Sequence, residues 1–162
     1  MSEQEFISLL NQHQKIIHKI CHVYMSDAHD REDLFQEITL QAWKAFNSFR
    51  GEAQFSTWLY RVALNTAITF YRKEKRKPDV VQQNDFPETA EEKNHKEEQV
   101  SALQKAIASL SKIEKALVTL YLEDYSYIQI GEMLGITANN VAVKMNRVKT
   151  KLKEETQKHY QL

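Results

Sequence analysis

The segment 138–152, near the end of the chain, carries amide and cationic side chains on one side. On a helix, its apolar residues such as Val141 and Met145 share the other face and must lie in a core. The outward face holds Asn139, Asn140, Val143, Lys144, Asn146, Arg147, Thr150 and Lys151. Amides and cations contact base edges and phosphates in a major groove, and an outward valine could meet a thymine methyl. Because this face has no acid, the pattern favours DNA contact over an ordinary solvated surface.

A second stripe, polar and with one aromatic residue, lies on the segment Phe55–Lys77. The core face of this segment includes Leu59 and Phe70. A narrow arc away from that face holds Trp58, Arg61, Asn65, Thr69, Arg72 and Arg76. Aromatic rings stack on bases and arginines follow the phosphate backbone, so the stripe as a whole predicts contact with nucleic acid. For Trp58 alone, burial between helices is an equally good interpretation.

A third face, on the segment Arg31–Phe46, combines acids with large apolar residues. Leu34 and Ile38 belong to the core stripe of this segment. The outward side chains are Asp33, Gln36, Glu37, Leu40, Trp43 and Lys44. An outward leucine and tryptophan beside acids are typical of a protein-binding surface. The alternative for Trp43 is packing against a neighbouring helix of the same domain.

Helices with regular apolar spacing must position these faces in the N-terminal part. Apolar residues recur every three or four positions over 6–24, which predicts one amphipathic helix. Asp30 could cap the next helix, because its carboxylate can accept from the first free N–H groups. Gly51 then closes the region, and the following helix is expected to begin at Ser56 or Thr57.

In the C-terminal part, two capping boxes predict where helices begin. They are Ser111–Glu114 and Ser126–Gln129, in which the serine and the residue three positions later satisfy each other's backbone donors. A further helix over 103–110 precedes them. Gly135 is expected to end a short helix in a tight turn, and Thr137 to cap the long basic helix. A short helix, a tight turn and a basic helix are the sequence form of a helix-turn-helix.

The composition predicts an all-α protein made of two small helical domains. Three glycines and two prolines among 162 residues argue against a turn-rich β fold. Both prolines lie in residues 78–98, where apolar periodicity is nearly absent, so a flexible acidic linker is expected there. It would join domains at 1–77 and 99–162, each small enough to have only a modest core.

Net charge is zero, but the charge is unevenly distributed along the chain. Residues 1–77 carry 11 Lys and Arg against 9 Asp and Glu, residues 78–101 carry 2 against 7, and residues 102–162 carry 9 against 6. Two mildly basic blocks therefore flank an acidic middle, and the neutral total does not exclude a nucleic-acid partner. One cysteine, Cys21, allows no intrachain disulfide. With no signal peptide and no run of about 18 apolar residues, we expect a cytoplasmic protein without membrane insertion.

Two long stretches resemble a known family. The stretch DREDLFQEITLQAWKAFNSFRGEAQFSTWLYRVALNTAITFYRK is similar to region 2 of bacterial RNA polymerase sigma factors of the extracytoplasmic-function (ECF) type, in the sigma-70 family. The stretch LQKAIASLSKIEKALVTLYLEDYSYIQIGEMLGITANNVAVKMNRVKTKLKE resembles their region 4. The two cover most of the chain in the family's order. No helical domain lies between them, which marks this smallest class of sigma factor.

The resemblance implies a role for each face. The DLFQE face would contact the clamp helices of the polymerase largest subunit, and the core-polymerase-binding residues would be Asp33, Gln36, Glu37, Leu40 and Trp43. The SFRGEA loop and the helix after it would capture a flipped base of the −10 promoter element and hold the strand, through Phe49, Arg50, Tyr60, Arg61, Asn65, Arg72 and Arg76. The last helix would enter the major groove of the −35 element, through Asn139, Asn140, Val143, Lys144, Arg147 and Lys151.

The sequence departs from the family pattern in two places. The basic run YRKEKRK is milder than in many members and is interrupted by Glu74. The recognition helix has NNVAVKMN where the family often shows more arginine and serine. Both departures bear on the promoter sequence that is recognised and leave the fold unaffected.

We therefore expect a sigma factor that binds core RNA polymerase through its clamp helices and flap region, reads both elements of promoter DNA and helps open the duplex. The resemblance also implies an anti-sigma factor as a partner. The alternative is a stand-alone helix-turn-helix regulator, which would leave the Asp33–Trp43 face unexplained. The sequence has no phosphate loop and no nucleophile paired with a base. His13, His18 and His22 do not share one face of a helix, which argues against a metal site. We therefore expect no enzyme, and no metal, cofactor or small-molecule substrate.

Overall fold

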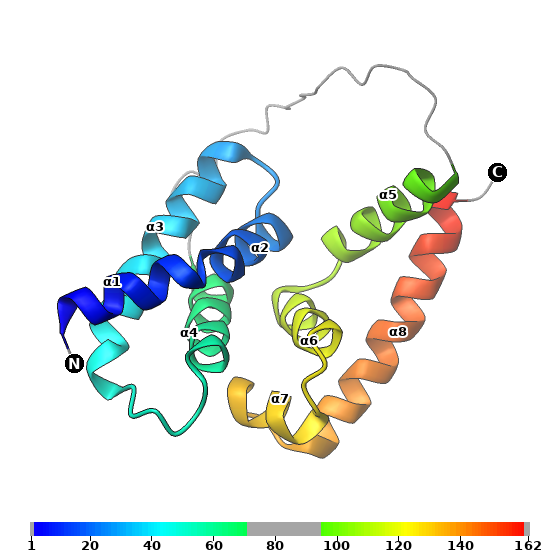
Figure 1. The fold of residues 1–162 in the computed structure, drawn as a ribbon. Coiled ribbons are helices and arrows are strands. Elements are labelled where there is room, and N and C mark those ends of the chain that lie inside the picture. Colours follow the sequence, from blue (N-terminus) through cyan, green and yellow to red (C-terminus); the bar gives the residue numbers. More distant parts are fainter. Residues whose placement is uncertain (1, 71–94, 161–162) are drawn as a thin grey trace.

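The computed structural model describes residues 2–70 and 95–160, and within these ranges all regular structure is helical (Figure 1). The N-terminal half contains α1 (Glu3–Gln12), α2 (Gln14–Tyr24), α3 (Ala28–Ala45), a 3-10 turn η1 (Phe46–Ser48) and α4 (Phe55–Thr69). The C-terminal half contains α5 (His95–Ala108), α6 (Lys112–Leu122), α7 (Tyr127–Leu134) and α8 (Ala138–Tyr160). The predicted all-α class with two helical parts is confirmed. Within the described ranges, no helix has the length and apolar character needed to span a bilayer.

The single helix predicted over 6–24 is wrong, because the helix breaks at His13. There the backbone leaves the helical region, with φ −118° and ψ 19°. At the break, the backbone N–H of His13 bonds the carbonyls of Leu9 and Leu10, and its Nδ1 lies 2.9 Å from the Leu9 carbonyl oxygen.

The predicted N-cap of α3 and the predicted start of α4 are also wrong. Asp27, not Asp30, caps α3: its carboxylate accepts from the backbone N–H of Asp30 at 3.4 Å. Asp27 has the extended backbone that an N-cap residue adopts, whereas Asp30 lies inside the helix. α4 begins at Phe55, so Ser56 and Thr57 lie inside the helix. Gln54 is its N-cap residue and makes no side-chain cap hydrogen bond. The predictions for Arg72 and Arg76 lie outside the described residues.

The caps predicted in the C-terminal half are confirmed. Both capping boxes form, at Ser111–Glu114 and at Ser126–Gln129. Gly135 ends α7 in the left-handed conformation at φ 78°, where a side chain would be strained. The Thr137 hydroxyl accepts from the backbone N–H of Asn140 at 3.0 Å and caps α8. α5 begins at His95, inside the range expected to be a linker.

The two halves share one core, although a separate modest core was expected for each. α6 contacts both α2 and α4, and α7 contacts α4, so the C-terminal half lies against the N-terminal half (Figure 1). The buried Leu117 and Leu120 of α6 belong to the same apolar cluster as Ile17 of α2 and Leu64 of α4. A smaller cluster inside the C-terminal half holds Leu110, Val118 and Val148. Apolar residues of α6 therefore belong to two cores.

Candidate nucleic-acid and protein-binding surfaces

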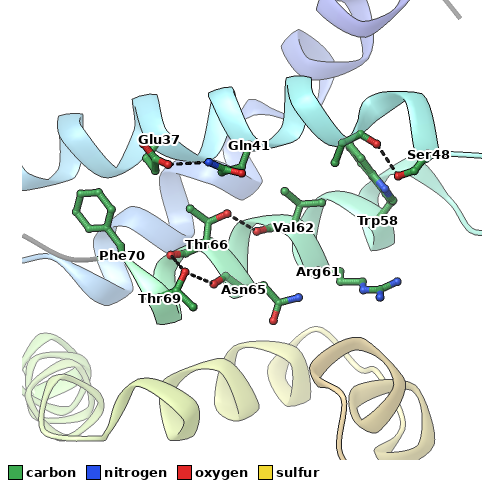
Figure 2. Close-up of a pocket in the computed structure, with 11 residues that line it drawn as sticks. Glu37, Gln41, Ser48, Trp58, Arg61, Val62, Asn65, Thr66, Thr69 and Phe70 are labelled. Atoms are coloured by element: carbon green, nitrogen blue, oxygen red, sulfur yellow. Dashed lines mark hydrogen bonds between the residues drawn. The ribbon is translucent and has the colours of Figure 1, made fainter.

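A groove of about 780 Å³ runs between α3 and α4 and brings together part of the predicted −10 site. Arg61 and Asn65 line it from α4, and Glu37 and Gln41 line it from α3 (Figure 2). Gln41 Nε2 donates to Glu37 Oε2 at 2.8 Å, which fixes the orientation of the amide. The groove thus presents a guanidinium and two amides, groups that bind phosphate and base edges.

Trp58 belongs both to the core and to the lining of this groove. Its ring is half-buried, with centroids 5.4 Å from Phe49, 5.3 Å from Phe55 and 6.1 Å from Phe46. It also lines the groove beside Arg61. A ring held on one side by other aromatics keeps its remaining surface in a fixed orientation, which suits stacking on a base.

The loop between η1 and α4 holds two of the predicted −10 residues close to this ring cluster. Phe49 is half-buried, with its centroid 5.7 Å from Phe55 in an edge-to-face arrangement. Arg50 is exposed, and Gly51 follows it at φ 78°, a conformation that favours glycine. The loop therefore offers a cation next to an anchored aromatic residue, at the end of the groove marked by Trp58.

Tyr60 does not line the groove. It is only 5% exposed, and its hydroxyl accepts from Lys19 Nζ at 3.2 Å. Its ring centroid lies 6.1 Å from that of Tyr125, which comes from the C-terminal half. Burial raises the pKa of the Tyr60 phenol, so the group stays neutral. Tyr60 thus faces the C-terminal half, whereas Arg61 and Asn65 face the groove.

The residues predicted to bind core polymerase divide between two surfaces. A second groove, of about 440 Å³, lies between α1 and α3 and is lined by Gln36, Leu40 and Trp43. Trp43 is 44% exposed, although its ring also packs 5.1 Å from Phe6 of α1. Phe6, Ile7 and Phe35 complete an apolar lining. Asp33 is exposed one turn before Glu37, and Glu37 itself lines the other groove.

The predicted −35 residues lie on the outer face of α8, with two qualifications. Val141, Met145 and Val148 are buried as expected. The exposed members of the predicted set are Asn139, Asn140, Val143, Arg147 and Lys151, and Lys144 is half-buried. Lys151 is also engaged: its Nζ lies 2.8 Å from a carboxylate oxygen of Glu114.

The helix-turn-helix is tightly packed at its turn. A Cβ placed on Gly131 of α7 would lie 2.5 Å from the Ile136 carbonyl oxygen and 3.3 Å from the Ala138 nitrogen. The backbone N–H groups of Gly135 and Ile136 both bond the Gly131 carbonyl, at 2.8 and 2.9 Å. The absence of a side chain at Gly131 thus lets α7 approach the start of α8, which fixes the angle of the outer face.

Sequence reasoning missed several residues that the fold places at these surfaces. Gln41 follows Glu37 by one helical turn, and that spacing was the available signal. Lys19 and Tyr125 contact Tyr60 across separations of 41 and 65 residues, for which no local pattern exists. The ring of His22 lies against the backbone of its own helix, with Nδ1 2.9 Å from the His18 carbonyl oxygen. Over the described residues, no three His, Cys, Asp or Glu side chains come together as metal ligands would.

Comparison with protein families gives two matches. Residues 9–77 match the family model for sigma-70 region 2, and residues 101–152 match that for sigma-70 region 4. The first match covers the α3/α4 groove and the α3 side of the α1/α3 groove, and the second covers the helix-turn-helix. Together they span most of the described residues.

Similar proteins and structures point the same way. The chain is 27% identical to the ECF RNA polymerase sigma factor SigW of Bacillus subtilis, over 94% of this chain and 89% of that protein. It is 30% identical to the RNA polymerase sigma factor SigZ of the same species, over 76% of this chain and 70% of that protein. Its fold resembles the Bartonella quintana sigma factor RpoE solved in complex with the anti-sigma factor NepR, with a TM-score of 0.71 at 18% identity over 95% of this chain and 98% of that chain. CnrH in complex with the cytosolic domain of CnrY gives a TM-score of 0.63 at 17% identity, over 94% and 88%.

Proposed function

We propose how three surfaces share the work of this chain, which belongs to the extracytoplasmic-function sigma factors of the sigma-70 family. As a sigma factor it binds core RNA polymerase, recognises the −10 and −35 promoter elements and promotes strand opening to initiate transcription. Its partners are core polymerase, promoter DNA and an anti-sigma factor. The stand-alone regulator is not favoured, because that class does not need region 2.

The α1/α3 groove is the proposed binding surface for the polymerase clamp helices. Leu40 and Trp43 are exposed apolar residues on it, and Gln36 adds a polar group at its edge. A partly anchored tryptophan over an apolar groove is a common hot spot of protein interfaces. Asp33 would add charge at the rim of this surface, which steers association more than it strengthens binding.

The α3/α4 groove is the proposed track of the unpaired −10 strand. Arg61 would hold phosphate, Trp58 would stack on a base, and Asn65 would read a base edge. Gln41, fixed by Glu37, adds a second amide to the opposite wall. The lining of this groove by Trp58, Arg61 and Asn65 together is the observation that carries the proposal.

The exposed face of α8 is the proposed reader of the −35 element. Asn139 and Asn140 sit at its N-terminal end, which enters the groove first in helix-turn-helix proteins. Val143 is 44% exposed and would meet a thymine methyl, and Arg147 would contact phosphate or guanine. The chain acts by binding, without chemistry of its own, and it works in the cytoplasm beside RNA polymerase.

Transcription in vitro with purified core polymerase tests this division, with core association and promoter opening scored separately. We expect Trp43→Ala to weaken core association by about tenfold. We expect Asn65→Ala to reduce promoter opening by about tenfold. Core association should be unchanged, because Asn65 lines the α3/α4 groove and not the α1/α3 groove. Asn11→Ala, an exposed amide on α1 outside both grooves, should change neither.

Two outcomes would contradict the proposal at different levels. If Asn65→Ala lost core association and opening equally, the assignment of the α3/α4 groove to DNA would be wrong. If the unmodified chain never associated with core polymerase, its function as a sigma factor would be refuted.

A further inference from the structure

We propose that Gln41 of α3 selects one base of the −10 strand, and that Glu37 acts as its positioning residue by fixing which way the Gln41 amide points. The selected base carries an exocyclic amino group, as adenine and cytosine do. This inference rests on the proposed function of the α3/α4 groove, and it adds to that function a residue and a class of base.

The hydrogen bond between Gln41 and Glu37 determines the orientation of the amide. The two residues lie one helical turn apart on α3, and both are half-buried. Gln41 Nε2 donates to Glu37 Oε2 at 2.8 Å. A carboxylate has only acceptor oxygens, so the amide must turn its nitrogen toward Glu37. Its carbonyl oxygen, Oε1, is therefore directed away from Glu37.

The neighbouring polar groups leave Gln41 Oε1 available to a ligand. In Figure 2 the Glu37–Gln41 pair lies across from Val62 and Thr66 of α4. The Thr66 hydroxyl donates to the Val62 carbonyl at 2.8 Å, and the Ser48 hydroxyl donates to a backbone carbonyl of α3 at 2.7 Å. In the part of the chain that the structure describes, the bond to the carboxylate is the only hydrogen bond that the Gln41 amide makes.

Charge distinguishes the two walls of the groove. The α4 wall has the guanidinium of Arg61, whereas the α3 wall has the carboxylate of Glu37. A phosphate is attracted to the first and repelled by the second. The strand therefore runs with its backbone along α4 and its base edges toward α3. Gln41 is thus placed to meet a base edge and not a phosphate.

The fixed amide is complementary to an amino base and not to a keto base. Gln41 Oε1 accepts from the amino group of adenine or cytosine, and the second N–H of the amide can donate to the ring nitrogen beside that group. Guanine and thymine present a carbonyl oxygen and a ring N–H instead, which match the amide only after it turns over. Turning over would bring Oε1 against a carboxylate oxygen of Glu37 and lose the hydrogen bond between them.

The base that Gln41 selects is not the base proposed to stack on Trp58. Phe49 follows Ser48, and its ring centroid lies 5.4 Å from that of Trp58, so Trp58 marks that end of the groove. Ser48 and Gln41 are about 10 Å apart along the helix axis, at about 1.5 Å of rise per residue. A strand advances about 3.4 Å per stacked nucleotide, so the two side chains contact separate bases.

Base analogues test the proposal in holoenzyme made from the full chain and core polymerase. The templates are unpaired over the −10 element, so that a change of base does not change duplex stability. Holoenzyme first selects its preferred strand from a randomised pool of these templates. Each adenine of that strand is then replaced by hypoxanthine and each cytosine by uracil, one position at a time, which exchanges an amino group for a keto oxygen. We expect template affinity to fall about tenfold at the position that meets Gln41.

Two variants assign this preference. Gln41→Met keeps the length of the side chain and removes its polar groups, so the amino-over-keto affinity ratio should fall below about twofold. Glu37→Gln lets either amide donate to the other, so the Gln41 amide can turn over and the ratio should also fall. Each ratio is taken within one variant, so a lower stability or a weaker core association cancels. Gln12→Met, an exposed amide on α1 outside both grooves, should keep the ratio.

Different results would overturn different parts of the proposal. An unmodified chain with no amino preference at any −10 position would overturn it, as would a preference that Gln41→Met leaves intact. A ratio lost in Gln41→Met but kept in Glu37→Gln would show that Glu37 does not set the orientation of the amide. If Arg61→Ala and Asn65→Ala both left template affinity unchanged, the proposed function of the groove would fail. A failure confined to the Gln41 variant would leave that function standing.

Discussion

At the scale of single residues, Glu114 combines two electrostatic tasks in the C-terminal half. Its carboxylate accepts from the Ser111 backbone N–H at 2.9 Å, which caps α6, and it pairs with Lys151 of α8 at 2.8 Å. Partial burial alone would raise its pKa, but the Lys151 ammonium and the Ser111 N–H more than offset that effect and lower it. The residue therefore links the start of α6 to α8.

This lowered pKa predicts a pH-dependent contribution to stability. A carboxyl whose pKa is lower in the folded state stabilises above its unfolded value, here 4.5, and the contribution is lost as pH falls through the folded pKa. We expect Glu114→Gln to lower the free energy of unfolding at pH 7 by about 1 kcal/mol, measured by urea denaturation. The difference from the unmodified chain should shrink below pH 4.5.

Glu154→Gln provides the control, because this acid is exposed on α8 and its substitution should have little effect at either pH. A difference between Glu114→Gln and the unmodified chain that stayed constant from neutral to acid pH would show that hydrogen-bond geometry, not charge, explains the effect of Glu114.

At the scale of elements, α3 is the wall between the two grooves. Consecutive residues of α3 line different grooves. Gln36 and Leu40 line the groove with α1, and Glu37 and Gln41 line the groove with α4. α3 therefore contributes residues to both grooves, and a change in its position would alter both.

The helix-turn-helix gives a prediction at this scale, at Gly131. An alanine there would place a methyl group 2.5 Å from a backbone carbonyl oxygen, so α7 would have to move away from the turn. We expect Gly131→Ala to lower the free energy of unfolding by about 1–3 kcal/mol, measured by urea denaturation followed by far-UV circular dichroism.

Glu132→Ala, one residue along on the exposed side of α7, should change stability by less than about 0.5 kcal/mol. Unchanged stability in Gly131→Ala would mean that the turn can relax at little cost, and that the approach of α7 to α8 does not fix the reading face.

At the scale of the whole molecule, the shared core predicts that the two halves unfold together. Both tryptophans of the chain, Trp43 and Trp58, lie in the N-terminal half, so their fluorescence reports that half alone. Leu110→Ala creates a cavity in the small cluster of the C-terminal half and should cost about 2–4 kcal/mol there. In Leu110→Ala, we expect the midpoint of urea unfolding to fall to a lower urea concentration. The midpoint should fall whether unfolding is followed by tryptophan fluorescence or by circular dichroism.

A tryptophan transition unchanged by Leu110→Ala would mean that the halves unfold independently, and that the apolar contact of α6 with α2 and α4 adds little to stability. Ala108→Gly, in the same half but on the last turn of α5, gives a comparison in which no core side chain is removed.

Several helix ends and buried faces could be predicted from the sequence, because the interactions that set them are local. The capping boxes at Ser111 and Ser126 and the left-handed Gly135 depend on residues a few positions apart, so pattern alone located three helix ends. The buried and exposed faces of α8 follow from helical periodicity. The family is likewise carried by contiguous motifs, and both family models match the stretches that the resemblance rested on.

Tertiary contacts resolve what helical periodicity leaves ambiguous. A helical face says which residues point the same way, and it does not say which neighbour covers them. Thus Trp58 lies in both core and groove, Glu37 lies apart from Gln36, and Tyr60 lies against Tyr125 of the other half. The physical reason is that these contacts join residues distant in sequence, and their free energy arises from burial and charge pairing that exist only once the halves meet.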